Sequence, residues 1–154
     1  MILAVQEIEN VKLNFYGDGP DLNILKEYCN VNKFKNVIFY GRYDISEIGT
    51  IYAEADLIWA AYPNKNLNVK YAISNKFFEC IAFKKIGIFS EKTKIGEFVS
   101  QNKIGLTVDP YDYEKIRVEI ERFIKDNEKK YIMDGIKNFK EDVYWDSYEG
   151  EVEL

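Results

Sequence analysis

The sequence predicts an α/β domain in which a parallel sheet carries helices on both faces. Short apolar runs rich in β-branched and aromatic residues alternate with amphipathic stretches along the chain, which is the pattern of consecutive strand and helix units. The length of 154 residues matches one typical domain with one core. Strands joined by helices in this order should be parallel, with right-handed crossovers and a ligand crevice at their carboxyl ends.

The first predicted strand and helix occupy the segment after Asn10. Val11–Tyr16 (VKLNFY) is typical of a strand, and Gly17–Pro20 (GDGP) ends it. Pro20 fits the first turn of a helix, because its missing N–H has no intrahelical partner there. The buried face of this helix is expected to consist of four residues at helical spacing: Ile24, Leu25, Tyr28 and Cys29.

Two further strands flank a second helix. Val37–Tyr40 (VIFY) predicts the second strand, and Asp56–Ala61 (DLIWAA) predicts the third. Asp44 followed by Glu47 has the spacing of a capping box, which predicts a helix from near Ile45. The core side of this helix should carry four residues: Ile48, Ile51, Tyr52 and Ala55.

The second half of the chain repeats the alternation after a polar, Asn-rich segment, Tyr62–Tyr71, which is expected to be a loop. Strands are expected at Ile86–Phe89 and Gly105–Val108. Helices are expected at Asn75–Phe83, Ile95–Asn102, Tyr113–Lys125 and Glu128–Asn138. The apolar face of the third of these helices consists of Ile116, Ile120, Phe123 and Ile124.

Both ends of the chain have the pattern of an interrupted helix. Ile2–Val5 resembles the last turns of a helix, and Val143–Leu154 stops inside a helix-compatible pattern. No repeat, low-complexity segment or linker divides the sequence. We therefore expect residues 1–154 to form one domain excised from a larger protein.

Composition excludes several classes of function. The net charge of −5 disfavours nucleic acid as a partner, because binding its phosphate backbone needs a basic surface that releases counterions. The absence of histidine removes Ser-His-Asp and Cys-His nucleophiles and the commonest metal ligand, so no metal site is expected. No apolar run approaches the roughly 20 residues that span a bilayer. Cys29 and Cys80 fit buried reduced thiols, as in a cytoplasmic protein.

Two segments offer groups for anion binding. Gly17–Pro20, between a strand and a helix, would place backbone N–H groups near a phosphate, although a tight turn without a ligand explains it equally well. Ser74–Glu79 (SNKFFE) opens a helix, so the free N–H groups of residues 73–76, the helix dipole and Lys76 would converge on an anion. Glu79 suits sugar hydroxyls. These groups fit a nucleotide, and an exposed i,i+3 pair of Lys76 with Glu79 remains the alternative.

Six segments, in order over nearly the whole chain, carry a family resemblance. They are Leu13–Pro20 (LNFYGDGP), Val37–Arg42 (VIFYGR), Tyr52–Pro63 (YAEADLIWAAYP), Ser74–Ala82 (SNKFFECIA), Ile104–Asp112 (IGLTVDPYD) and Tyr144–Glu149 (YWDSYE). Together they resemble the C-terminal half of a GT-B glycosyltransferase, most similar to the family 4 retaining enzymes. The resemblance implies a Rossmann-like domain, residues 1–154, that binds a nucleotide-sugar donor. An N-terminal acceptor domain and a final C-terminal helix would then lie outside this chain.

The resemblance implies roles for matching positions. Glu79 matches the second glutamate of the family's Glu-x7-Glu motif, which implies contact with the ribose hydroxyls. Ile73–Lys76, with Ser74 and Asn75, matches the helix N-terminus that meets the diphosphate. Two loops should line the rest of the site: Gly41 and Arg42 near the base, and Gly17 and Gly19 along the cleft. Among these residues, Lys76 and Glu79 are expected to carry catalysis.

Two positions depart from the family pattern. Tyr71 stands where the first motif glutamate would contact the donor sugar, and a subgroup with an Asn-Lys-x-x-Glu signature, which Asn75–Glu79 resembles, also lacks that glutamate. Tyr71 is nevertheless expected to bind the nucleotide sugar. Tyr43 and Tyr62 lie in similar loops, where they could stack on a base or sugar. Lys84–Ile86 replaces the usual Gly-x-Pro, so a non-Gly residue is expected to end the helix in the left-handed conformation, at roughly 1 kcal/mol.

The resemblance implies a glycosyltransferase of hexosyltransferase type. It would transfer a glycosyl group, with retention, from a nucleoside-diphosphate sugar to a saccharide or lipid-linked acceptor in surface polysaccharide biosynthesis. The nucleotide sugar is then a substrate, and no cofactor is expected. The isolated domain should be inactive without its N-terminal GT-B domain, through which peripheral association with the inner face of the membrane stays open. The alternative is a non-catalytic nucleotide-binding or interaction domain on the same fold.

Overall fold

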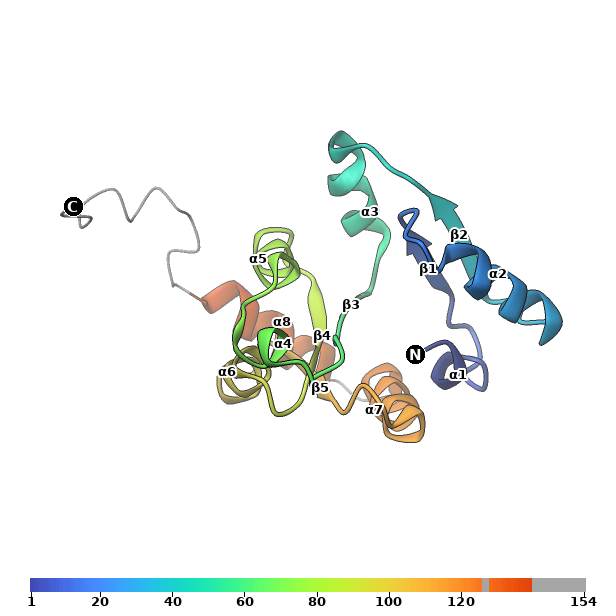
Figure 1. The fold of residues 1–154 in the computed structure, drawn as a ribbon. Helices are drawn as coiled ribbons and strands as arrows, with labels where there is room; N and C mark the ends of the chain where they lie inside the picture. Colours follow the sequence, from blue (N-terminus) through green and yellow to red (C-terminus); the bar gives the residue numbers. More distant parts are fainter. Residues whose placement is uncertain (126–127, 140–154) are drawn as a thin grey trace.

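The computed structural model describes residues 1–125 and 128–139 (Figure 1). The strands are β1 (Leu13–Tyr16), β2 (Val37–Gly41), β3 (Leu57–Ala60), β4 (Ile86–Ser90) and β5 (Gly105–Val108). The helices are α1 (Ile2–Val5), α2 (Leu22–Val31), the 3-10 helix η1 (Ile45–Glu47), α3 (Ile48–Glu54), α4 (Leu67–Tyr71), α5 (Asn75–Ala82), α6 (Lys94–Asn102), α7 (Tyr113–Lys125) and α8 (Glu128–Asn138). The helical pattern expected over Val143–Leu154 and the motif Tyr144–Glu149 lie outside the described residues.

The strands form two parallel sheets that no strand pairing joins within the described residues. In the first sheet, β1 pairs with β2, and Leu13 lies opposite Val37. In the second, β4 lies between β3 and β5, and Ile88 pairs with Trp59 on one side and Leu106 on the other. Figure 1 shows β1 on the side of β2 that faces β3. The predicted parallel α/β architecture is confirmed, but it consists of two sheets rather than one continuous sheet.

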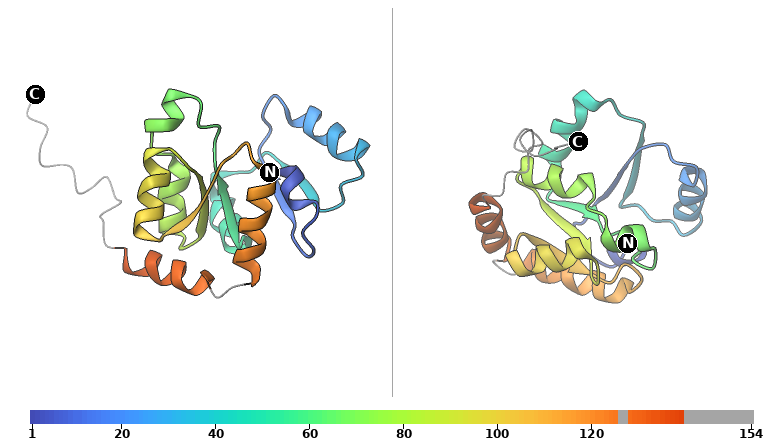
Figure 2. Two further views of the ribbon diagram at one scale, coloured as in Figure 1. Left: turned by 90° about the horizontal axis from the view of Figure 1, so that it is seen from below. Right: turned by 60° about the vertical axis from the view of Figure 1, so that its left-hand side comes forward.

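The three-stranded sheet carries most of the core. Every residue of β4 is buried, because strands flank both its edges and helices cover the sheet. α5 contacts β3 and β4, α6 contacts β4 and β5, and α7 contacts β5 and α1. Figure 2 shows α5 and α6 across the sheet from α7. Phe77 of α5 packs edge-on against Phe89 and Phe98, with ring centroids 6.0 and 5.9 Å away. This packing fixes α5 with its N-terminus at the carboxyl edge of the sheet.

Tyr62–Tyr71 is not entirely loop, as the Asn-rich sequence predicts, because its last five residues form α4. The Asn66 side chain caps this helix by accepting a hydrogen bond from the Asn68 N–H at 2.8 Å. α4 has no buried residue. The sequence of α4 therefore has no hydrophobic periodicity from which a helix could be predicted.

The sequence predicts three helix ends, and the structure agrees with the prediction at η1 and α5 but not at α2. The Asp44 side chain accepts from the Ser46 N–H, and Glu47 accepts from the Asp44 N–H at 2.7 Å, so the predicted capping box is confirmed. Lys84, after α5, has a φ of 52°, so a non-Gly residue does take the left-handed conformation there. Pro20, in contrast, lies in the turn before α2 rather than in its first turn. A hydrogen bond from the N–H of residue 22 to the carbonyl of residue 19 closes this turn before the helix begins.

Two predicted helix faces are less buried than expected. Ile24 and Tyr28 of α2 are 66% and 41% exposed, and only Cys29 of that face is buried. α2 lies beside a two-stranded sheet, which is too small to cover the whole apolar stripe. On α7, Ile124 is 52% exposed, at the margin of a face otherwise buried. Both cysteines are buried free thiols, as predicted, and none of the described helices has the length and apolarity needed to cross a bilayer.

Candidate functional site

The candidate site lies at the carboxyl edge of the second sheet, where α5 begins. Ser74 is the N-cap of α5, but its side chain makes no capping hydrogen bond. Its Oγ is buried and has no hydrogen-bond partner in the described part of the chain. The first N–H groups of the helix, beginning with Asn75 and Lys76, therefore lack the usual side-chain acceptor. Together with the helix dipole, these N–H groups favour an anion.

Glu79 lies one turn into α5, and a tyrosine holds its carboxylate. The buried Tyr52 hydroxyl, from α3, donates a hydrogen bond to Glu79 Oε2. Burial first, and then the hydrogen bond and charge of Glu79, raise the pKa of Tyr52 far above its ordinary value, so the hydroxyl stays protonated. None of the ion pairs among the described residues joins Glu79 to Lys76. The exposed pair considered from the sequence is thus not formed.

Two further side chains are close enough to respond to the Glu79 charge. Tyr62, which follows β3, is 40% exposed, and burial and Glu79 together raise its pKa. Cys80 lies on the core side of α5, and burial raises the pKa of its thiol to about 12 although Lys76 opposes the shift. Glu79 therefore lies at the boundary between the core and the loop after β3.

The two glycine turns, Gly17–Pro20 after β1 and Gly41–Asp44 from the last residue of β2, contact each other. The Gly17 N–H donates to the Gly41 carbonyl at 2.6 Å. Their φ angles, 127° and 78°, belong to the left-handed region that glycine tolerates. Arg42 forms an ion pair with Asp18 at 3.0 Å, with the two side chains 82% and 52% exposed, so the pair contributes little to stability. The predicted residues of the two turns thus form one unit.

Tyr43 belongs to the second glycine turn and packs on the end of β1. Its ring meets Tyr16 edge-on, with centroids 6.1 Å apart. Tyr16 in turn stacks on Tyr40 at 4.6 Å. No hydrogen bond or ion pair of the described residues joins the glycine turns directly to α5. The aromatic side chains instead pack the two glycine turns together at the carboxyl ends of β1 and β2.

A hollow of about 180 Å³ opens beneath the segment that joins β3 to α5. It is lined by Ala60, Tyr62, Asn68, Val69, Ala72, Ser74, Ser90, Thr93 and Ile95. Ser90 Oγ donates to the Tyr62 carbonyl, and Thr93 Oγ1 donates to the Ser90 carbonyl at 2.8 Å. These hydroxyls are therefore occupied, whereas Ser74 Oγ is not. The hollow is smaller than the roughly 300 Å³ of a usual ligand pocket.

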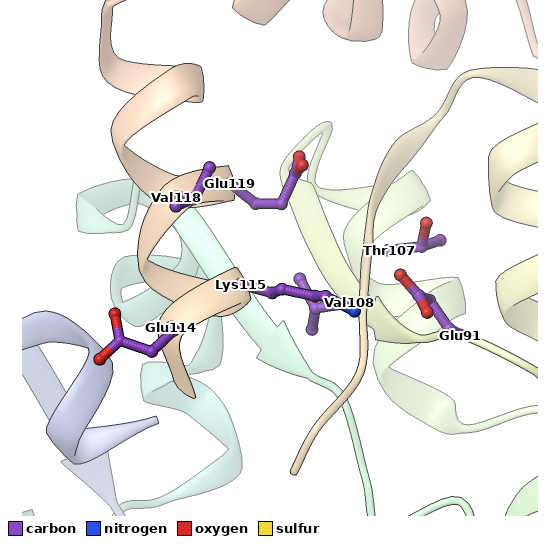
Figure 3. A pocket seen from close by; sticks show the side chains of 7 residues that line it. All are labelled: Glu91, Thr107, Val108, Glu114, Lys115, Val118 and Glu119. Atoms are coloured by element: carbon purple, nitrogen blue, oxygen red, sulfur yellow. The ribbon is translucent and has the colours of Figure 1, made fainter. Parts of the chain in front are cut away.

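A second hollow, of about 200 Å³, lies between β5 and α7 (Figure 3). Its lining consists of Glu91, Thr107, Val108, Glu114, Lys115, Val118 and Glu119. Three carboxylates accompany one ammonium group, a balance that repels a diphosphate. None of the residues predicted for the site lines this hollow.

The remaining predicted residues are Tyr71, the last residue of α4, and Ile73, between α4 and α5, and both are exposed. Tyr71 and Ile73 are 59% and 54% exposed, and the Lys70 ammonium lies 5.7 Å from the Tyr71 ring centroid. Sequence reasoning missed the contact of Tyr52 with Glu79. Its helical spacing marks Tyr52 only as a core residue, and no short-range pattern links two residues 27 positions apart.

Comparison with known families decides the classification. The glycosyl transferases group 1 family matches residues 1–126. The chain belongs to this family. The match includes every residue predicted for the site, from Gly17 to Glu79. Among curated proteins, no sequence matches significantly.

Solved structures of glycosyl transferases group 1 proteins and related enzymes share the fold. The C-terminal domain of a group 1 family protein (LpcC) from Francisella tularensis has a TM-score of 0.67 at 22% identity, covering 88% of this chain and 70% of that one. A glycosyltransferase from Rickettsia africae has a TM-score of 0.69 at 20% identity, covering 88% and 36%. HepE from Anabaena, solved in complex with UDP-glucose, has a TM-score of 0.65 at 17% identity, covering 87% and 37%.

The TM-scores show that this chain shares the fold of these domains. Sequence identities of 22% or less extend this likeness to the fold alone. The expected C-terminal half of a GT-B fold is confirmed. The chain spans 70% of the Francisella domain but only 36% and 37% of the Rickettsia and Anabaena chains.

Proposed function

We propose that this chain is the donor-binding domain of a glycosyltransferase and binds a nucleoside-diphosphate sugar at the N-terminus of α5. One observation carries the proposal. In a glycosyl transferases group 1 domain, a single helix combines an N-terminus without a side-chain cap, the ammonium of Lys76 and, one turn further on, the carboxylate of Glu79. The first two favour the diphosphate, and the third favours the ribose hydroxyls.

Each group would have a defined role in transfer. The N–H groups of residues 73–76 and Lys76 would hold the diphosphate and stabilise the charge that develops on it as it leaves. Glu79 would accept hydrogen bonds from the ribose, and Tyr71 would lie near the donor sugar. The backbone of the glycine turns, with Arg42, would line the side of the base. The nucleotide sugar is a substrate in this scheme, and no cofactor takes part.

The family resemblance supports a more specific reaction. It is transfer of a hexosyl group, with retention, as in the family 4 enzymes, to a saccharide or lipid-linked acceptor in surface polysaccharide biosynthesis. The acceptor would bind a separate N-terminal GT-B domain, so that this domain alone would be inactive. The protein would act in the cytoplasm, at the inner face of the membrane. The complex of HepE with UDP-glucose supports a UDP sugar as the first donor to test.

A second candidate is a non-catalytic nucleotide-binding domain on the same fold. Tyr71, 59% exposed, occupies the place of the carboxylate that would contact the donor sugar. An assay of glycosyl transfer from UDP-glucose, with the N-terminal domain present, separates the candidates. Nucleotide binding without any release of UDP would favour the second.

Isothermal titration calorimetry with UDP, GDP, ADP and UDP-glucose tests the binding step. We expect one nucleotide to bind, and Glu79→Ala and Lys76→Ala each to weaken it by about tenfold or more, because each removes a charge-assisted contact. The matched controls are Glu121→Ala and Lys125→Ala, which remove an exposed ion pair on α7. These controls should leave the affinity unchanged. If no nucleotide binds, or if the α5 variants bind as well as the controls, the proposed function is wrong.

A further inference from the structure

We infer that Tyr52 is a positioning residue that fixes the Glu79 carboxylate in the orientation in which it receives the ribose of a nucleotide. The inference rests on the proposed function of Glu79 and adds a residue from a different element, α3. The observation behind it is the hydrogen bond from the Tyr52 hydroxyl to Glu79 Oε2.

Tyr52 is held rigidly enough to serve as a fixed donor. Its side chain is 3% exposed, and its ring packs against Phe83, beyond the end of α5, with centroids 4.8 Å apart. A second connection ties the same two helices together, because Lys85 Nζ donates to the carbonyls of Ala53 and Ala55 at 2.8 and 2.9 Å. The end of α3 and the end of α5 therefore keep a constant relation, and the hydroxyl has little freedom to move.

This rigidity matters because a glutamate side chain on a helix surface is mobile by itself. Loss of its rotamer freedom on binding a ligand reduces affinity. The bond to Tyr52 occupies one carboxylate oxygen and orients the other, Oε1, whose lone pairs remain for ligand hydroxyls. Part of the ordering is thus complete before a nucleotide arrives. Tyr52 stays protonated, so it acts by hydrogen bonding and not by proton transfer.

A purely structural role would give the same static picture. In that case the bond would serve only to satisfy the buried hydroxyl of Tyr52, and its removal would affect all ligands alike. A positioning role makes a narrower demand. Removal of the hydroxyl should weaken only those ligands that have ribose hydroxyls for Glu79 to bind.

The test compares Tyr52→Phe with the unmodified protein by calorimetry, using UDP, GDP and ADP and their 2′,3′-dideoxy counterparts. Phe keeps the ring that packs on Phe83 and removes only the hydroxyl. We expect the affinity for the ribonucleotide to fall by about tenfold and that for the dideoxy form to change by less than about twofold. In a Glu79→Ala background, Tyr52→Phe should cause no further loss, because the effect passes through that carboxylate.

Tyr28→Phe is the matched control, because that hydroxyl lies on α2, away from α5, and its removal should change neither affinity. Thermal melting of each variant checks that the fold is kept. An equal loss for ribonucleotide and dideoxynucleotide, a loss that persists without Glu79, or no loss at all would overturn the inference while leaving the proposed function standing. If the unmodified protein binds no nucleotide, or if Glu79→Ala binds normally, the proposed function fails first and the inference fails with it.

Discussion

Cys80 and Glu79 are neighbours on α5 but face different environments. Glu79 reaches the site, whereas Cys80 is 2% exposed and packed in the core. Burial raises the pKa of the Cys80 thiol from 9.0 to about 12, and burial also raises the pKa of Cys29. Since the thiolate is the reactive form, both cysteines should be inert in the folded protein.

We expect a thiol-reactive disulfide reagent to label neither cysteine appreciably at about pH 8, but to label both in denaturant.

The raised pKa of Cys80 also makes the stability of the fold depend on pH. The unfolded thiol ionises above pH 9.0 while the folded Cys80 keeps its proton up to about pH 12, so the contribution of this group is complete below pH 9.0 and is lost as the pH rises through that window. Urea unfolding measured at increasing alkaline pH should show the loss. Rapid labelling of Cys80 under native conditions would contradict its burial.

At the scale of single residues, the sequence predicts a group when its chemistry depends on near neighbours. Lys76 and Glu79 could be selected because they lie on the first turns of one helix. The capping box of Asp44 with Glu47 could be predicted for the same reason. The contact of Tyr52 with Glu79 could not, because it depends on how two helices pack.

At the scale of elements, the join between β4 and α6 depends on a glycine. A Cβ atom on Gly96 would lie 2.0 Å from the Ser90 carbonyl oxygen, which is backbone and cannot rotate away. The same turn is closed by Thr93, which accepts from the Gly96 N–H at 3.0 Å and donates to the Ser90 carbonyl at 2.8 Å. The first turn of α6 therefore passes the Ser90 carbonyl at a position where only glycine fits.

Gly96→Ala should lower the free energy of unfolding by about 3 kcal/mol, because the helix must shift away from β4 to relieve the overlap. Gly49→Ala is the matched control. A Cβ there would make only an ordinary contact, 3.9 Å from Phe83, and alanine favours the helix, so stability should rise by about 0.5–1 kcal/mol. Chemical denaturation of both variants measures the contrast. Equal effects of the two substitutions would mean that the close approach at Gly96 does not exist.

Predictions of elements succeed where periodicity is strong and tertiary packing agrees with it. β5, α7 and α8 have the predicted bounds, because their apolar residues recur at the spacing of a buried face. α4 could not be predicted, since a five-residue helix without a buried residue has no apolar period. The apolar stripe of α2 predicts the helix correctly, but it does not predict which residues of that stripe are buried. Burial depends on the size of the partner surface, which α2 itself does not encode.

At the scale of the whole molecule, the described strands form two separate sheets, whereas a doubly wound fold needs only one. Such folds usually form one sheet in which the strand order reverses near the ligand site. Here β1 pairs only with β2, and β3 only with β4, in the described part of the chain. β3 has the sequence LIWA and β1 the sequence LNFY, neither with the charge or proline that usually protects an edge strand. The sequence predicts all of these strands but not the division between them, because pairing partners are not encoded in local pattern.

The division predicts a contrast in amide hydrogen exchange. The N–H groups of Leu13 and Gly17 donate to the Asn36 and Gly41 carbonyls of the β2 side. Since successive N–H groups along a strand alternate in direction, those of Asn14 and Tyr16 point to the unpaired edge. They should exchange within about tenfold of the rate of an unfolded peptide, whereas amides of the central strand β4 should be slower by about a thousandfold or more.

Exchange followed residue by residue with NMR measures this contrast, and Leu13 provides the internal control, because it shares the strand but donates a hydrogen bond of 2.8 Å. Protection of Asn14 and Tyr16 equal to that of β4 would contradict an open edge and would require another strand to pair there. Repeating the measurement at several protein concentrations identifies one source of such a strand. Protection that rises with concentration would come from a second copy of the chain, and protection that is independent of concentration would come from within a single copy.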